Sequence, residues 1–171
     1  VDLYARVSAD RSESAQDLVA ERYAQCLRES LQPQVAALPP EQQQALQALD
    51  KALDDWEEGI YDVWHHGTSL ATHLTLRAAV GRAQLLRQLL AALKAPAPSA
   101  AAQRANQAAF MAQLLRQGLR TTDRKAPDAE SRVTFDEAKQ RFVKAMRALE
   151  QVERSLPPQA LPLVTDHLRR R

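Results

Sequence analysis

The feature that most constrains the fold is a regular apolar pattern between residues 46 and 63. Its members follow one another at alternating steps of three and four residues: Leu46, Leu49, Leu53, Trp56, Ile60 and Val63. This spacing puts them on one side of an α-helix, whereas a half-buried strand would need apolar and polar residues in alternation. The pattern therefore predicts a long amphipathic helix whose apolar seam packs against neighbouring helices.

A second seam with similar spacing lies near the end of the chain. It consists of Phe135, Ala138, Phe142, Ala145, Leu149, Val152 and Leu156, and is followed directly by Pro157. Thr134 and Glu137 fit a capping box, in which the Thr hydroxyl accepts a hydrogen bond from the third helical amide and the Glu reaches back. The sequence predicts another amphipathic helix, opened by Thr134.

Prolines, glycines and polar runs divide the remaining chain into further helices. We expect a first helix over about residues 2–31, ended by Pro33, with an apolar stripe of Leu18, Val19, Tyr23, Cys26, Leu27 and Leu31. Gly67 predicts the end of the helix that holds the first seam, and a broadly apolar helix follows at 70–94. A helix over about 100–119 is expected to bury Ala108, Met111, Leu115 and Leu119.

Composition supports an all-α class, because Ala and Leu dominate while aromatic residues make up 5% and glycine occurs four times in 171 residues. These abundant residues lose little freedom in a helix. We predict a bundle of five to six amphipathic helices around a central antiparallel helical hairpin that turns at Gly67. The chain 1–171 would form a single helical domain, in which the proline-containing segment 95–99 could act as a hinge between 1–94 and 100–171.

Charge is unevenly distributed, although the net charge is only +2. Residues 41–66 contain seven carboxylates and one lysine, a balance of −6, while residues 67–122 contain no carboxylate. Two interpretations remain open: the acidic helix packs beside the basic one and compensates its charge, or the region 67–122 presents a basic face to a polyanion. Nucleic acid is disfavoured, because Phe110 is the only aromatic residue in that region.

Polar and aromatic residues gather around the predicted hairpin turn. Asp62 and His66 are four residues apart on one helix face, and His73 follows across the turn. Carboxylate and imidazole groups in such positions can bind Zn²⁺ or a similar metal ion. The alternative is a polar cap in which histidines stabilise the helix C-terminus. Further candidates for a binding face are Tyr61, Trp64, His65, Arg77, Arg82 and Arg87.

The sequence favours a protein without catalytic activity. Cys26 is the single cysteine, which excludes a disulfide within this chain, and its place in an apolar stripe predicts a small core residue. Four scattered glycines argue against a phosphate-binding loop. No serine has the setting of an activated nucleophile, so we expect neither an enzyme nor a cofactor.

Three short segments resemble a known family. Leu38-Pro-Pro-Glu-Gln-Gln, Thr134-Phe-Asp-Glu-Ala-Lys and Leu156-Pro-Pro-Gln with a basic end are similar to periplasmic helical proteins with paired LTxxQ motifs. That group includes the Spy-type envelope chaperones and related metal-stress sensors. Proline stands in place of the motif threonine in both copies. The resemblance implies a cradle-shaped helical dimer that binds unfolded proteins or metal.

These patterns together predict a non-enzymatic helical bundle that binds a protein partner and could form a homodimer. The alternatives are a ligand- or metal-sensing bundle that uses residues 62–73, and a polyanion-binding protein that uses residues 67–122. No run approaches eighteen apolar residues, so we expect no transmembrane helix. The chain begins at Val1, which is typical of a processed or excised chain, and we expect a periplasmic or envelope location, with the cytoplasm as the alternative.

Overall fold

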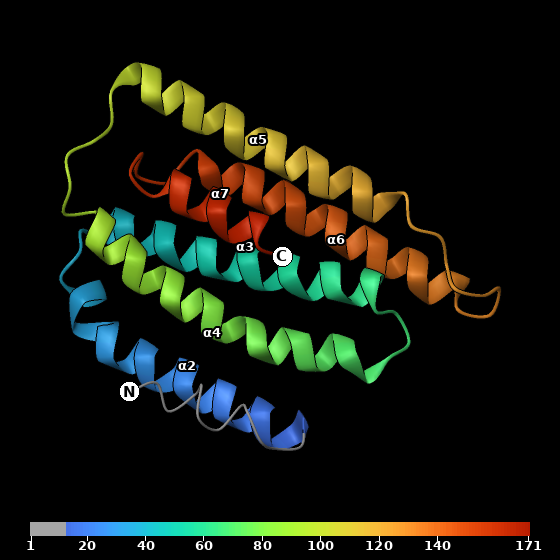
Figure 1. Cartoon of the computed structure of the whole chain (residues 1–171). Coiled ribbons are helices and arrows are strands. Elements are labelled where there is room, and N and C mark those ends of the chain that lie inside the picture. Colours follow the sequence, from blue (N-terminus) through green and yellow to red (C-terminus); the bar gives the residue numbers. More distant parts are fainter. Residues whose placement is uncertain (1–12) are drawn as a thin grey trace.

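The computed structural model describes residues 13–171, which contain six α-helices joined by turns and loops. They are α2 (Glu13–Ala36), α3 (Pro40–Trp64), α4 (Ser69–Ala92), α5 (Ala100–Thr122), α6 (Arg132–Glu153) and α7 (Leu161–Arg169). The predicted all-α bundle is confirmed, while residues 2–12 of the expected first helix lie outside the described residues. Figure 1 shows α2 at one edge of the bundle and α5 at the opposite edge, with the other helices between them.

The predicted central hairpin is present as α3 and α4. α3 ends at Trp64, where the His65 amide donates a hydrogen bond to the Tyr61 carbonyl at 2.8 Å. In the turn that follows, Gly67 has a φ of +75°, a backbone conformation that residues with a side chain rarely adopt. The seam of α3 is buried throughout, since none of its six residues is more than 5% exposed. α3 carries the centre of the core because α4 and α6 pack on it from different sides.

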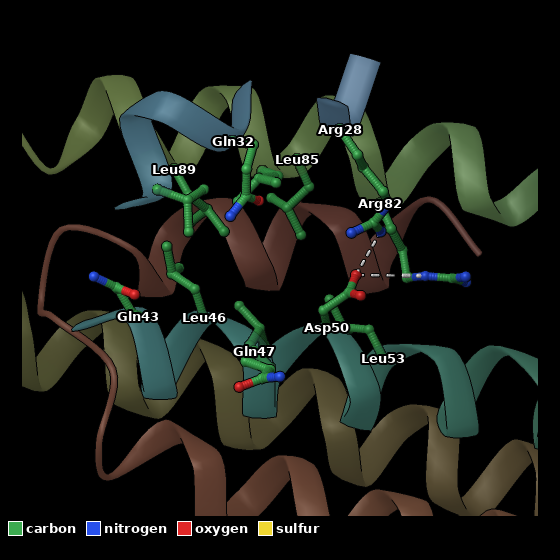
Figure 2. Close-up of a pocket in the computed structure, with 13 residues that line it drawn as sticks. Arg28, Gln32, Gln43, Leu46, Gln47, Asp50, Leu53, Arg82, Leu85 and Leu89 are labelled. Carbon is green, nitrogen blue, oxygen red and sulfur yellow. Dashed lines mark hydrogen bonds and ion pairs between the residues drawn. The ribbon is translucent and has the colours of Figure 1, made fainter. Parts of the chain in front are cut away.

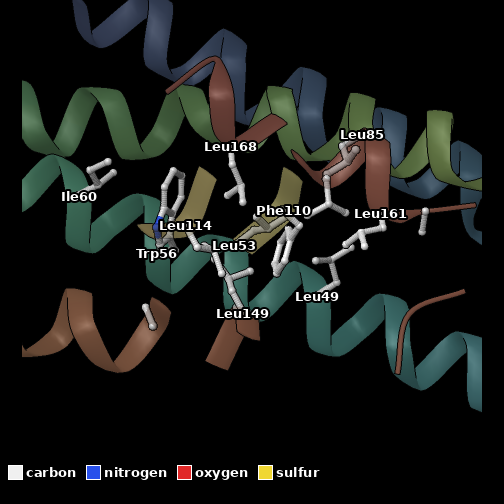
Figure 3. Packing of buried hydrophobic residues seen from close by; sticks show 14 of the residues in the cluster. Leu49, Leu53, Trp56, Ile60, Leu85, Phe110, Leu114, Leu149, Leu161 and Leu168 are labelled. Carbon is white, nitrogen blue, oxygen red and sulfur yellow. The ribbon is translucent and has the colours of Figure 1, made fainter. Parts of the chain in front are cut away.

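The second seam meets the first one. Phe135, Ala138, Phe142, Ala145 and Leu149 of α6 are buried. A Cβ atom added to Gly59 of α3 would lie 3.0 Å from the Phe142 Cα atom, so these two helix backbones approach closely. Phe110 and Leu114 of α5 and Leu161, Val164 and Leu168 of α7 complete the same cluster (Figure 3). Segment 95–99 therefore joins two halves that share one core.

Two predicted helix boundaries are wrong. α2 runs through Pro33 and ends at Ala36, because a proline in the last turn removes one amide donor without preventing three more helical residues. α6 begins at Arg132 rather than at Thr134. The carboxylate of Asp128 accepts hydrogen bonds from the Ser131 amide at 2.7 Å and from the Ser131 hydroxyl at 2.8 Å. These bonds order the turn before α6, so the helix begins earlier than predicted.

The predicted apolar face of α2 is right only in part, and that of α5 is wrong. In α2, Leu31 is buried and Tyr23 and Leu27 pack against the core, as predicted. Leu18, however, is 67% exposed and Cys26 is exposed, and the small residues Ala20 and Ala24 form part of the inner face. In α5, the buried face consists of Phe110, Gln113, Leu114, Gln117, Gly118 and Thr121, and the expected Met111, Leu115 and Leu119 are exposed. Phe110 and Leu114 share the inner face of α5 with polar residues such as Gln117 and Thr121, so the apolar pattern alone did not indicate this face.

Among residues 13–171, no helix combines the length and the apolar character that crossing a membrane requires.

Candidate functional site

Of the three residues predicted to bind metal, Asp62 and His66 lie together, whereas His73 lies elsewhere. His73 lies against the carboxylate of Asp17, a buried residue of α2. His66 Nε2 lies 3.1 Å from the Thr134 hydroxyl of α6, and its Nδ1 is 3.6 Å from Asp62 Oδ1. Within residues 13–171, no three His, Cys, Asp or Glu side chains are arranged to hold a metal ion. The prediction that Asp62, His66 and His73 form one site is therefore wrong.

The aromatic candidates at the hairpin turn are largely covered by α5 and the loop after it. Trp64 Nε1 donates to the Thr121 hydroxyl at 3.2 Å, and the Arg124 guanidinium lies 4.2 Å from the centre of the indole ring. Tyr61, Trp64 and His65 line a cavity of about 200 Å³ beside the C-terminal residues. All three residues are partly exposed, so their place on a binding face stays a prediction.

The three arginine candidates of α4 have different environments. Arg87 is exposed, whereas Arg77 Nε donates to the Asp17 carboxylate at 3.0 Å. The Arg82 side chain is only 9% exposed, and its Nη2 lies 2.8 Å from Asp54 Oδ1 of α3. Charge compensation between α3 and α4 is thus confirmed at Arg82, while Arg77 pairs with α2. These arginines do not form one continuous basic face.

Glu57 is the clearest residue that the sequence analysis missed. It is fully buried beside Trp56. Arg82 Nη1 donates to its Oε2 at 2.5 Å, His167 Nε2 lies 2.7 Å from its Oε1, and Arg171 Nε forms an ion pair with that oxygen at 3.1 Å. A carboxylate can only accept, so His167 Nε2 carries a proton. In the sequence, the only local sign that Glu57 is buried is its position one residue from the α3 seam.

This Glu57 cluster ties three helices together and offers little chemistry. Its members come from α3, α4, α7 and Arg171, which follows α7. A general base needs contact with a substrate and room to exchange a proton, whereas both oxygens of Glu57 are occupied by cations or imidazole and sealed from water. The cluster is therefore a structural connection that also holds Arg82 in place.

An apolar stripe runs along the outer side of α5. Its exposed members follow one another at steps of four and three residues: Ala101, Ala105, Ala108, Ala112, Leu115 and Leu119. Leu115 is 62% exposed and Leu119 is 55% exposed. Arg104 and Arg116 are exposed on opposite sides of the stripe, and α5 contains no carboxylate. Figure 1 shows α5 at the edge of the bundle, with no helix beyond it.

The relationship of this chain to known proteins gives no guide to its function. The resemblance to LTxxQ-motif proteins stays a prediction. Comparison with protein-family models, with curated proteins and with solved structures gives no significant match.

Proposed function

We propose that this protein is a non-enzymatic interaction protein whose partner packs an acidic amphipathic helix on the α5 stripe. The observation that carries the proposal is the exposure of Leu115 and Leu119, at 62% and 55%. Burial of apolar surface contributes about 25 cal/mol per Å², so a partner that covers this stripe gains free energy. Contiguous exposed apolar surface of this kind is typical of interaction sites.

The spacing of the stripe favours a helix as the occupant. Alternating steps of four and three residues make the seam that a second helix packs on in a coiled coil. The first four members, from Ala101 to Ala112, are small and allow close approach of a partner backbone. Leu115 and Leu119 then supply the larger apolar contacts.

The charges beside the stripe favour an acidic occupant. Arg104 and Arg116 flank the seam in the positions from which side chains reach across to a partner helix. A second copy of α5 would place arginines near arginines, whereas glutamates on the partner would pair with them. A different, acidic protein is therefore the better partner, and a homodimer is the weaker alternative.

A synthetic helical peptide tests the proposal. It carries Leu at the seam positions and Glu at the flanking positions, and a control peptide carries Lys at the same flanks. We expect the acidic peptide to bind with a dissociation constant in the micromolar range that weakens as salt rises, because exposed charges are screened. Binding is measured by fluorescence anisotropy of the labelled peptide.

Matched variants locate the binding surface. Leu115→Gln should abolish binding of the acidic peptide, while Leu18→Gln, which replaces another exposed leucine on α2, should leave it unchanged. Equal binding of the Lys peptide would contradict the acidic partner. Dimerisation of the protein alone, lost in Leu115→Gln, would show that the occupant is a second copy.

A further inference from the structure

A depression of about 600 Å³, here called the α6 depression, lies on the outer side of α6. Its apolar members are Val143 and Ala148, which are half-buried and pack against the main core. Three cations also line it, Lys139, Lys144 and Arg147, whereas no carboxylate of residues 13–171 does. The α6 depression therefore combines apolar surface with positive charge.

The cations of the α6 depression are not neutralised by the protein. Within residues 13–171, the ion pair of α6 is formed by Arg141 with Asp62, and none of the three lining cations takes part in one. Lys139 Nζ donates to the Thr122 carbonyl at 2.7 Å, a contact with a neutral group. Because Lys144 and Arg147 are exposed, their charges remain free to meet the carboxylates of another molecule.

Other arginines of the bundle have their counter-ions inside the protein. Arg28 Nη2 of α2 lies 2.6 Å from Asp50 Oδ1 of α3, and Arg82 Nε of α4 lies 3.8 Å from the same oxygen. Figure 2 shows the Asp50 carboxylate between these two guanidinium groups. The unpaired cations of α6 differ from them, which makes the α6 depression the better candidate for an acidic partner.

The α6 depression lies beside the α5 stripe. Gly118 of α5 faces the Met146 sulfur of α6, which marks where the two helices touch. Leu115 lies three residues before Gly118, and a step of three residues turns a side chain by about 60° around the helix axis. Val143 lies three residues before Met146 in the same way. Because α5 and α6 run in opposite directions (Figure 1), these equal steps turn Leu115 and Val143 to the same side of the contact.

The joint face of α5 and α6 is an apolar strip with cations at both edges. Leu115 and Leu119 are 62% and 55% exposed on α5, and Val143 continues the apolar surface on α6. Arg116 lies on the edge of α5 away from α6, and Arg147 follows Val143 by one turn on α6. A helix that covers the strip would thus meet positive charge on both of its flanks.

We infer that the partner helix lies along the junction of α5 and α6 and contacts both of them. Its apolar seam covers Leu115, Leu119 and Val143. Its carboxylates on the α6 side pair with Lys144 and Arg147, which makes these two cations determinants of partner choice. The occupant is the acidic helix of the proposed function, so this inference rests on that proposal and adds a second helix to the binding surface.

Charge reversal tests the inference with the Glu-flanked and Lys-flanked peptides of the anisotropy experiment. Arg147→Glu and Lys144→Glu should each weaken binding of the Glu-flanked peptide by about three- to tenfold, because a surface ion pair is replaced by repulsion. Both variants should strengthen binding of the Lys-flanked peptide. Arg87→Glu, at an exposed arginine of α4, makes the same change in net charge and should leave both affinities unchanged. Circular dichroism checks that each variant is folded.

A chemical cross-link locates the peptide independently of its affinity. Carbodiimide activation joins a carboxylate to an amine that touches it, so the Glu-flanked peptide should become attached to Lys144, as identified by mass spectrometry of the digested product. Lys51 of α3 should not react with the peptide. Lys144→Arg keeps the charge, so it should retain the affinity and lose this cross-link.

The possible failures can be told apart. Binding that is lost in Leu115→Gln but unchanged in Arg147→Glu and Lys144→Glu, without a cross-link to Lys144, would place the partner on α5 alone. That result would overturn this inference and leave the proposed function standing. Absence of binding of the Glu-flanked peptide to the wild type would overturn both. Binding of a heparin oligosaccharide that is lost in Arg147→Glu and kept in Leu115→Gln would assign the α6 depression to a polyanion instead.

Discussion

At the residue scale, the burial of Glu57 shows how a single side chain can connect distant parts of the chain. Removing a carboxylate from water is costly, and the cost is offset only when charged partners and hydrogen bonds surround it. Arg82, His167 and Arg171 supply these partners from positions far along the chain. Without Glu57, two guanidinium groups would lose their shared counter-ion.

We expect Glu57→Gln to lower the free energy of unfolding by about 3–5 kcal/mol, the usual cost of removing one partner from a buried ion pair. Glu58→Gln, at the neighbouring exposed position, should change it by less than about 0.5 kcal/mol. Urea unfolding followed by tryptophan fluorescence measures both. Similar small effects of the two substitutions would contradict the role of the Glu57 cluster.

The phenol of Tyr61 is partly buried beside Arg171. Burial raises the pKa of its phenol above the ordinary value of 10.0, although Arg171, whose Nη1 donates to the phenol oxygen at 3.4 Å, opposes the change. Because the folded state holds the proton more tightly, its contribution to stability is present below the unfolded pKa and is lost as pH rises through the folded pKa. Stability should therefore fall more steeply between about pH 9 and pH 11 in the wild type than in Tyr61→Phe. Parallel pH profiles for the two proteins would be inconsistent with this pKa change.

At the scale of helices, close approach decides which substitutions the bundle tolerates. Gly59 lets α3 lie against the backbone of α6 at Phe142, where a Cβ atom would be 3.0 Å from a Cα atom. Gly118 of α5 faces the Met146 sulfur, which would lie 2.8 Å from an added Cβ. A backbone cannot yield without moving a helix, whereas a methionine side chain can rotate.

Gly59→Ala should therefore destabilise the protein by about 1–3 kcal/mol, as overpacking usually does. Gly118→Ala should be close to neutral, because the rotation of Met146 is offset by a helix-propensity gain of up to about 1 kcal/mol. Thermal and urea unfolding of the two variants provide the comparison. A larger loss for Gly118→Ala would contradict the packing described for α3 and α6.

At the scale of the whole molecule, the two halves on either side of 95–99 depend on each other. α3 packs against α6, α4 against α7, and the Glu57 cluster joins the hairpin to the C-terminal residues. Neither half has a complete core of its own, because the main cluster takes residues from both.

We expect residues 13–171 to unfold in a single cooperative transition. Tryptophan fluorescence, which reports on Trp56 and Trp64 of α3, should coincide with far-UV circular dichroism, which reports on all helices. Two separated transitions, or a fluorescence midpoint that differs from the dichroism midpoint, would mean that the halves unfold independently.

The class of fold, the two seams and the central hairpin could be predicted from the sequence alone. These features depend on local properties, namely the helical period of Leu46 to Val63 and of Phe135 to Leu149, and the positive φ that Gly67 adopts. Which side of α5 faces inward depends on the tertiary structure. The inner side of α5 carries Gln117 and Thr121, whose burial is tolerated because Leu168, Arg171 and Trp64 provide hydrogen bonds. Those partners are more than fifty residues away along the chain, so no local pattern could indicate them. The same holds for His167 and Arg171, which pair with Glu57.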